Sequence, residues 1–374
     1  MTTVPTVTNS ALSPLVLLRP LLVGALAVGL AACPSKQADP PTVPEVVAGL
    51  NVAKPPPLAE AVASNPLCVG RPAAGPEEVL DIAGHKYTRK GSTVSLEGQD
   101  GDDEFILGQI TDIKDHTPEN AATLKIAVDW LLSEKADAIA VTGDLGETAA
   151  SIQRSLEDIA AAGLPVLAIV GNRECRDDFD QGVKAAQTKF KNIINMNLVR
   201  VLNTDDVSIV SMPGYYNKSY IHCAEGCSYS SADVKELPEI AKMATAPTKI
   251  LISHGPPRQS GPLAIDRIHE GANVGDPALT EVLTSSALFP FGMFGNILEA
   301  GGHATNLSGE TRVAPDTWAD SLYLNSGPID SVRWVMLDGS QSIGMAGLIH
   351  VKGKQAMYKI KRIKPGEAAV AAPK

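Results

Sequence analysis

The chain has few aromatic side chains and no excess of basic ones. Phe, Trp and Tyr make up 4% of its 374 residues, and 42 acidic residues against 32 basic ones give a formal net charge of −10 at pH 7. No stripe of Lys and Arg with interleaved aromatics occurs, which argues against nucleic acid as a partner. An anionic ligand would therefore need local positive charge, from a bound metal ion or from a few placed cations.

Several catalytic signatures are also missing. The sequence contains no G-x-x-x-x-G-K phosphate-binding loop, no G-x-S-x-G nucleophile elbow and no G-x-G-x-x-G turn. These absences argue against P-loop, serine-hydrolase and dinucleotide chemistry. The remaining composition, 44% hydrophobic and 20% charged, is typical of a soluble globular protein. At this length we expect one α/β domain of roughly 250 residues with non-globular ends.

The first 33 residues have the pattern of a bacterial lipoprotein signal peptide. An apolar stretch from Leu21 to Ala32 ends in Leu30-Ala31-Ala32-Cys33, which resembles a lipobox. A transmembrane anchor is the alternative, but the stretch is shorter than the roughly 20 apolar residues that span a bilayer. We expect Cys33 to carry lipid. The protein would then be held at a membrane of the cell envelope through that lipid only, with its domain facing the periplasm or the exterior.

Composition divides the rest of the chain into three parts. Residues 34–66 are rich in Pro and Ala and are predicted to form an extended tether. Residues 67–363 alternate between strand-like and helix-like segments and are predicted to form the folded domain. Residues 364–374 have the composition of a frayed, disordered tail.

The first half of the domain alternates strictly between strands and helices. Strands are predicted over 105–111, 138–141 and 165–170, with helices over 118–132 and 148–162 between them. This order predicts parallel pairing through right-handed crossovers, which brings the carboxyl ends of the strands to one edge.

The second half of the domain is richer in strands. Helices are predicted over 177–195, 232–243 and 276–285, and strands over 322–325, 332–337, 343–350 and 356–360 are expected to close a second sheet. The balance favours an α/β fold of two packed sheets flanked by helices over one open sheet.

Four short polar segments follow apolar runs at the predicted strand ends. They are Thr111-Asp112-Ile113-Lys114, Gly143-Asp144-Leu145-Gly146-Glu147, Gly171-Asn172-Arg173-Glu174 and Ser253-His254-Gly255. Any one of them is typical of a turn or a helix N-cap. Together, at neighbouring strand ends, they offer carboxylate, amide and imidazole groups that suit divalent cations, and two such ions can activate water and offset phosphoryl charge.

In this order the four segments resemble the D-x-H, G-D-x-x-D/E, G-N-H-D/E and S/T-H-G/T-P-P motifs of the calcineurin-like metallophosphoesterases. Further along, Val274-Gly275-Asp276 and Phe294-Gly295-Asn296-Ile297-Leu298-Glu299-Ala300-Gly301 resemble the V-G…F-G-H-I-H-E-G stretch of the class III cyclic-nucleotide-phosphodiesterase-like branch. The resemblance covers roughly residues 105–327. It implies a four-layer αββα sandwich of two mixed sheets flanked by helices, and metal-dependent hydrolysis of a phosphomonoester or phosphodiester.

Carried over residue by residue, the resemblance implies metal ligands at Asp112, Asp144, Asn172, His254 and Asn296. His303, in Gly301-Gly302-His303-Ala304-Thr305, is an alternative to Asn296 in a second register. Two histidines of the first metal site are replaced by Lys114 and Leu298, and the histidine that protonates the leaving group is replaced by Arg173. The resemblance therefore implies one divalent ion, of Mn, Fe, Zn or Mg, rather than two.

The candidate catalytic residues are Arg173 and Lys114. An isolated Lys or Arg in a loop is usually a solvated cation, but here an ammonium beside Asp112 and Asp144 would offset their charge, and a guanidinium can grip phosphate. Glu147 is expected to support the site from outside it. The first hypothesis is a membrane-tethered hydrolase of a phosphorylated small molecule. The alternative is a pseudoenzyme lipoprotein that binds an anionic ligand or an envelope partner without catalysis.

Four cysteines remain besides Cys33, and an envelope location permits them to be oxidised. Cys223 and Cys227 are separated by three residues and are predicted to form a disulfide that closes a small loop. A metal pair is the alternative, but no second pair of Cys or His lies at zinc-site spacing. The sequence assigns no partner to Cys68 or Cys175.

Overall fold

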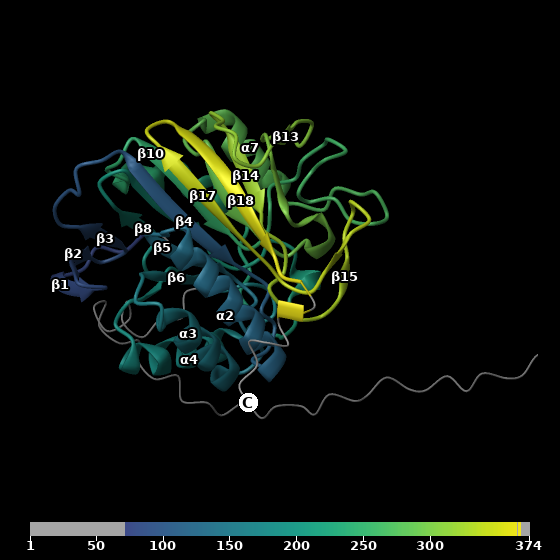
Figure 1. The fold of residues 1–374 in the computed structure, drawn as a ribbon. Coiled ribbons are helices and arrows are strands. Elements are labelled where there is room, and N and C mark those ends of the chain that lie inside the picture. Colours follow the sequence, from purple (N-terminus) through teal and green to yellow (C-terminus); the bar gives the residue numbers. More distant parts are fainter. Residues whose placement is uncertain (1–71, 365, 368–374) are drawn as a thin grey trace, which may run out of the picture. The chain divides into compact units, whose positions relative to one another are not determined.

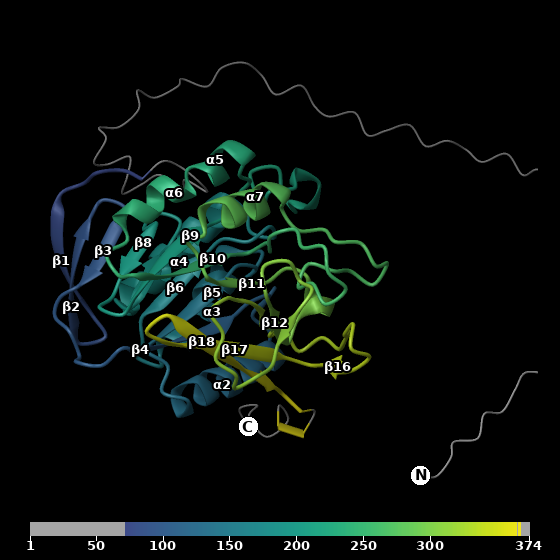
Figure 2. The same cartoon turned by 90° about the horizontal axis from the view of Figure 1, so that it is seen from above.

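Two β-sheets face one another between two layers of helices in the computed structural model, which describes residues 72–364 and 366–367. Figures 1 and 2 show α2, α3 and α4 on one outer face and α5, α6 and α7 on the other. The predicted four-layer sandwich of two mixed sheets flanked by helices is confirmed.

The predicted signal peptide, the lipid-bearing Cys33 and the tether lie outside the described residues. No helix in the described part is long and apolar enough to cross a bilayer.

The six-stranded sheet contains the predicted alternation of strands and helices. Its order is β18-β17-β4-β5-β6-β7. Its parallel strands are β4 (Glu104–Ile110), β5 (Ala138–Thr142), β6 (Val166–Ile169) and β7 (Ile193–Asn195). The helices that cover it are α2 (Pro118–Ser133), α3 (Ala149–Ala160) and α4 (Arg176–Lys189). The hydroxyls of Thr117 and Thr148 accept backbone hydrogen bonds and begin α2 and α3.

The last two strands, β17 (Met345–Lys352) and β18 (Gln355–Arg362), join this first sheet. They were expected to close the second sheet, and that expectation is wrong because β17 pairs antiparallel with β4. The reason is that β17 is apolar on both of its faces. Ala346 and Leu348 pack under the helices, whereas Ile349 and Val351 pack between the sheets. A strand that is apolar on both faces needs an interior position, which β17 has beside β4.

The ten-stranded sheet has the order β1-β2-β3-β8-β9-β10-β11-β14-β12-β13. Its strands are β1 (Glu77–Ile82), β2 (His85–Lys90), β3 (Thr93–Leu96), β8 (Val201–Asn203), β9 (Val207–Met212), β10 (Thr248–Ser253), β11 (Phe291–Phe294), β12 (His303–Thr305), β13 (Arg312–Val313) and β14 (Leu322–Asn325). The covering helices are α5 (Ser231–Lys235), α6 (Leu237–Ile240) and α7 (Pro277–Ser286). Short elements complete the described part: η1 (Lys218–Tyr220), η2 (Ala241–Met243), η3 (Leu298–Ala300), β15 (Trp334–Val335) and β16 (Gln341–Ser342).

Some predicted elements are shorter than expected. The helix predicted over 177–195 ends at Lys189, because Ile193 and Ile194 are buried and pair with β6 as the strand β7. The helix predicted over 232–243 divides into α5, α6 and η2, with Pro238 in the first turn of α6. Both differences come from tertiary pairing and a proline rather than from local hydrophobic spacing.

Aliphatic side chains fill the space between the two sheets. Leu107 and Leu167 from one sheet share a buried cluster with Ile250 and Met293 from the other. This packing holds β4, β5 and β6 against β10 and β11, and each of these sets is parallel. Polar residues that follow these five strands therefore gather at one edge of the sandwich.

Candidate metal centre

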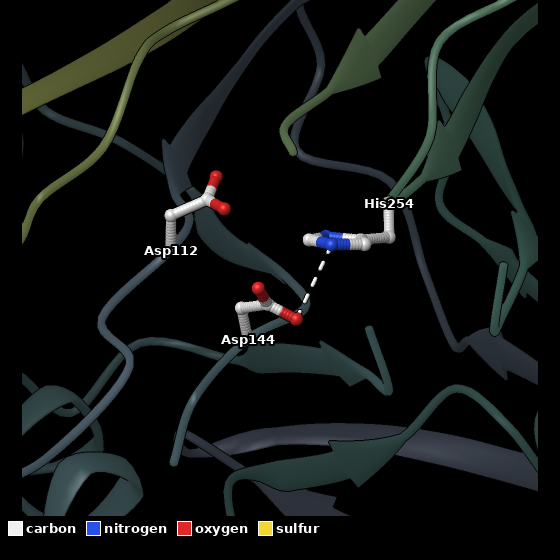
Figure 3. Close-up of side chains that lie close together, drawn as sticks. All are labelled: Asp112, Asp144 and His254. Carbon is white, nitrogen blue, oxygen red and sulfur yellow. Dashed lines mark ion pairs between the residues drawn. The ribbon is translucent and has the colours of Figure 1, made fainter. Parts of the chain in front are cut away.

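Three side chains from different strand ends converge at this edge. Asp112 follows β4, Asp144 follows β5 and His254 follows β10. One ligand atom from each lies within 4.8 Å of the others, and all three residues are buried. Figure 3 shows the two carboxylates and the imidazole facing a common space, with an ion pair joining Asp144 and His254.

The backbone turns sharply just past these strands. Asp112 and Asp144 both have φ 57° and Asn296 has φ 63°, in the left-handed region that Asp and Asn tolerate better than most residues. Gly171 permits a close approach, since a Cβ there would lie 2.3 Å from Asp144 Oδ1. The turns thereby aim the polar side chains inward across the edge rather than along the strands.

His254 is fixed through both of its ring nitrogens. Nδ1 lies 2.8 Å from the carbonyl oxygen of Thr142, which can only accept, so Nδ1 carries the proton in that bond. Nε2 lies 2.7 Å from Asn172 Oδ1 and 3.2 Å from Asp144 Oδ1. The Asn172 amide donates from Nδ2 to the carbonyl of Tyr220 at 2.7 Å, which turns its oxygen toward His254.

Two oxygen acceptors thus face a nitrogen whose own lone pair points toward them. A proton on Nε2 satisfies this arrangement, and a cation would satisfy it equally. Burial alone lowers the pKa of His254, but the carboxylates of Asp144 and Asp112 raise that pKa above its ordinary value. Burial has the opposite effect on a carboxyl group and raises the pKa of Asp112. The residues present therefore fit a divalent cation that takes the place of a proton.

Arg173 lies directly beside Asp144. The backbone N–H groups of Asn172 and Arg173 each donate to Asp144 Oδ1 at 3.1 Å, and Arg173 Nε lies 3.6 Å from Asp144 Oδ2. Its guanidinium also contacts the Glu147 carboxylate. The Arg173 side chain is only partly exposed, so its charge is held at the entrance to the cluster.

Of the two alternative ligands, Asn296 lies at the centre. Its backbone N–H donates to Asp112 Oδ2 at 3.1 Å and its amide donates to the hydroxyl of Tyr215 at 2.8 Å. His303 is part of β12, where its Nε2 bonds to the carbonyl of Leu263 at 2.9 Å, and it is not one of the residues of the buried cluster.

Lys114 does not contact the carboxylates of the cluster. Its ammonium lies 2.6 Å from Asp330 Oδ2 and 4.0 Å from the centroid of a Trp334 ring. The indole N–H of Trp334 donates to the other oxygen of Asp330 at 2.8 Å. The expected position beside Asp112 and Asp144 is therefore wrong. Lys114 acts on Asp112 only through space, because its left-handed backbone, φ 65°, directs the side chain elsewhere.

Glu174 joins two of the site loops, a role that sequence reasoning missed. Its carboxylate accepts hydrogen bonds from the backbone N–H of Leu145 and from that of Gly171, the latter at 2.9 Å. The side chain is fully buried, and burial raises the pKa of Glu174 to about 8. The only signal was its place at the end of Gly171-Asn172-Arg173-Glu174.

Gln109, in β4, connects the two sheets just below the site. Its amide donates to the hydroxyl of Thr142 at 2.9 Å and to the carbonyl of Phe294 at 2.8 Å. The strands that carry Asp144 and Asn296 are thereby held together. Local sequence carries no signal for this contact, because both partners lie in other strands, 33 and 185 positions away.

The predicted disulfide between Cys223 and Cys227 is wrong. Cys223 pairs with Cys175, 48 residues earlier, with their Cα atoms 5.8 Å apart. Cys175 precedes α4, and a β-bridge to Gly226 holds it against the loop that contains Cys223. Cys227 is buried under the helices of the first sheet. The disulfide ties this loop, which also covers Asn172, to the start of α4.

We expect the double variant Cys175→Ser, Cys223→Ser to lower the free energy of unfolding by about 2–4 kcal/mol, because the disulfide closes a long loop of the unfolded chain. The check is urea denaturation of both proteins without reductant. Reductant is left out because Cys227 is also disulfide-bonded and would be reduced as well. An unchanged midpoint in the variant would show that the Cys175–Cys223 disulfide does not stabilise the domain.

Comparison with known proteins leaves the family open. The chain matches no protein-family profile and no curated protein sequence. Among solved structures, a dimetal phosphatase from Danio rerio is 11% identical over 70% of this chain and 99% of its own, with a TM-score of 0.41. Purple acid phosphatase PPD1 from yellow lupin is 12% identical over 77% of this chain and 59% of its own, with a TM-score of 0.37. Overlap at this level carries no conclusion about activity.

Proposed function

We propose that this protein is a metal-dependent phosphoester hydrolase of the calcineurin-like superfamily that uses a single divalent cation. The observation that carries the proposal is the convergence of His254 Nε2, Asn172 Oδ1 and Asp144 Oδ1 from three strand ends. Asp112 lies close enough to complete or orient this set. Mixed imidazole and oxygen ligands suit Mn, Fe, Zn or Mg. A cation held there would polarise a phosphoryl oxygen and offset its charge.

A single cation fits the side chains around Asp112 better than two. Leu298 has no ligand atom, and the ammonium of Lys114 is paired with the carboxylate of Asp330. Asp112 Oδ2 already accepts from the Thr111 hydroxyl at 2.9 Å and from the Asn296 N–H at 3.1 Å. We propose that these donors hold Asp112 in place where relatives of the family would carry a second ion.

Arg173 would bind the phosphoryl group of the substrate. A guanidinium offers paired N–H donors that match phosphate oxygens, and its charge lies beside the proposed ligand Asp144. It cannot donate a proton near neutral pH, because arginine stays charged there. The substrate would be a phosphorylated small molecule, and lipid on Cys33 would keep the enzyme at the envelope membrane, as the lipobox pattern supports.

One observation favours the alternative, a pseudoenzyme that binds an anion. Asp144 lies 3.6 Å from Arg173 Nε and 3.2 Å from His254 Nε2, so side chains of the chain already face its carboxylate. Such an arrangement can persist as an anion-binding site without turnover. The two hypotheses differ in whether added metal produces hydrolysis.

The deciding experiment uses the full chain, stripped with EDTA and then supplied with Mn²⁺. We expect hydrolysis of 4-nitrophenyl phosphate or of bis(4-nitrophenyl) phosphate to disappear on stripping and to return with the metal. A folded protein that hydrolyses neither ester with any of Mn²⁺, Fe²⁺, Zn²⁺ or Mg²⁺ would contradict the enzyme hypothesis and favour the binding module.

We expect Arg173→Ala to raise KM and the inhibition constant for inorganic phosphate by about 10–100-fold, since a hydrogen bond to a charged group contributes roughly 1.5–3 kcal/mol. Arg176→Ala is the matched control, because Arg176 is a nearby exposed arginine paired with Asp177. Steady-state kinetics with phosphate as inhibitor measure both constants. Equal KM and inhibition constants in the two variants would show that Arg173 does not bind the phosphate.

A further inference from the structure

Cys227 is disulfide-bonded, and neither of the other two cysteines in the described part of the chain is its partner. Cys175 and Cys223 are joined to each other. The sequence contains five cysteines, so Cys33 and Cys68 are the remaining ones, and both lie outside the described residues. The partner of Cys227 within the chain is therefore Cys33 or Cys68.

Cys68 fits this bond better than Cys33. The lipobox pattern predicts a lipid on the sulfur of Cys33, which would leave that sulfur unable to form a disulfide. Cys68 stands four positions before Pro72, the first described residue, and four residues of chain span at most about 14 Å. Cys68 must therefore lie near the described N-terminal segment.

Hydrogen bonds link this N-terminal segment to the strand β9. The N–H of Ala73 donates to the Ser92 hydroxyl at 2.9 Å, and the N–H of Ser92 donates to the carbonyl of Ala73 at 3.0 Å. The carbonyl of Ser92 in turn accepts from the N–H of Arg200 at 2.7 Å. Ser211, near the end of β9, donates to the carbonyl of Arg200 at 3.0 Å.

The residues just past β9 contact Cys227. The N–H of Tyr215 donates to the carbonyl of Cys227 at 3.0 Å, and a Cβ on Gly214 would lie 2.9 Å from the same oxygen. Cys227 is 1% exposed, so its sulfur bonds to a partner that packs within the fold. The described N-terminal segment and the loop that contains Cys227 therefore both approach the same end of β9.

We propose that Cys68 and Cys227 form a second disulfide, which fastens the start of the domain to the loop beside the proposed metal centre. Its formation joins the two sulfur atoms and releases two protons and two electrons. A disulfide-bearing oxidant takes up the electrons by thiol–disulfide exchange, as for the bond between Cys175 and Cys223. The loop, residues 220–228, is then tied to the rest of the chain at two of its positions.

This loop supports two amide side chains of the centre. Near its start, the carbonyl of Tyr220 accepts from the Asn172 amide at 2.7 Å. Near its end, Cys227 holds the backbone of Tyr215, whose hydroxyl accepts from the Asn296 amide at 2.8 Å. A loop tied by two disulfides keeps both amides in place. This positioning role rests on the proposed metal function, whereas the disulfide itself does not.

Peptide mapping of the full chain, purified and alkylated without reductant, tests the pairing. Cleavage after glutamate separates Cys223 from Cys227, because Glu225 lies between them. We expect the peptide that contains Cys227 to be joined to the peptide that contains Cys68. A Cys227 peptide that is joined to Cys33 or to a second chain, or that is alkylated as a free thiol, overturns the proposal.

Counting thiols on unfolded monomers gives an independent result that does not require the variants to fold. Cys68→Ser should expose one more thiol per chain than wild type, because it leaves Cys227 without its partner. Cys33→Ser is the matched control and should add none. A gain in Cys33→Ser, or no gain in Cys68→Ser, contradicts the pairing.

Titration of folded Cys68→Ser with Mn²⁺ tests the positioning role. We expect the dissociation constant to rise about 10-fold, since groups that orient metal ligands typically contribute 10–100-fold to affinity. An unchanged constant would show that the disulfide only stabilises the fold and would overturn the positioning role. Wild type that binds no Mn²⁺ would overturn the proposed metal function and the positioning role together, while the peptide map decides the disulfide separately.

Discussion

Replacing Asp144 with Asn should abolish both stoichiometric metal binding and metal-dependent hydrolysis. Loss of a group that merely orients a ligand typically costs 10–100-fold, so loss of a ligand itself should cost at least about 100-fold in kcat/KM. The substitution keeps the size of the side chain and an oxygen that can accept from the backbone N–H groups of Asn172 and Arg173. What it removes is the negative charge that faces His254 and Arg173.

Mn²⁺ content by inductively coupled plasma mass spectrometry and ester hydrolysis measure the two effects together. Asp177→Asn is the matched control, since Asp177 is exposed in the first turn of α4. A variant at Asp144 that keeps its metal and its turnover would show that the buried cluster is not the active centre.

Replacing Lys114 with Met should lower the free energy of unfolding by about 3–5 kcal/mol, because it leaves a buried carboxylate without its cation. Asp330 is 1% exposed and Lys114 15% exposed, so water cannot take the place of the lost ammonium. The indole N–H of Trp334 would remain as a partner for Asp330, but it carries no charge to offset the carboxylate.

Two further variants make this stability prediction specific. Lys125→Met removes an exposed pair with Asp129, at 62% and 59% exposure, and should change stability by less than about 0.5 kcal/mol. Lys114→Met combined with Asp330→Asn should recover part of the loss, because the buried charge is then gone. Guanidinium denaturation measures all of them, and equal stability of Lys114→Met and wild type would contradict a structural role for the ion pair.

The backbone geometry of the centre was largely predictable from the sequence. Asp112, Asp144, Asn172 and His254 each follow an apolar strand, and parallel strands bring their carboxyl ends to one edge. The fold followed from the same alternation. The strand β17 was assigned to the wrong sheet, because a near-continuous apolar run shows that a strand is buried on both faces without identifying its partner.

Side-chain contacts were far less predictable. Lys114 stands two residues from Asp112, yet a left-handed turn sends its ammonium to Asp330, more than 200 positions later in the chain. Cys223 pairs with Cys175, which a β-bridge to Gly226 holds nearby, rather than with the cysteine nearest in sequence, Cys227. Long-range pairing of this kind is not encoded in local spacing.

The central claim is a single cation held by Asp144, Asn172 and His254, and counting bound ions tests it most directly. Isothermal titration of the EDTA-stripped full chain with Mn²⁺ should give one ion per chain in wild type and none in Asp144→Asn. Two ions per chain would contradict the single-cation proposal, because they would show that a first metal site exists despite Lys114 and Leu298. No bound ion in wild type would contradict a metal centre altogether and favour the pseudoenzyme that binds an anion.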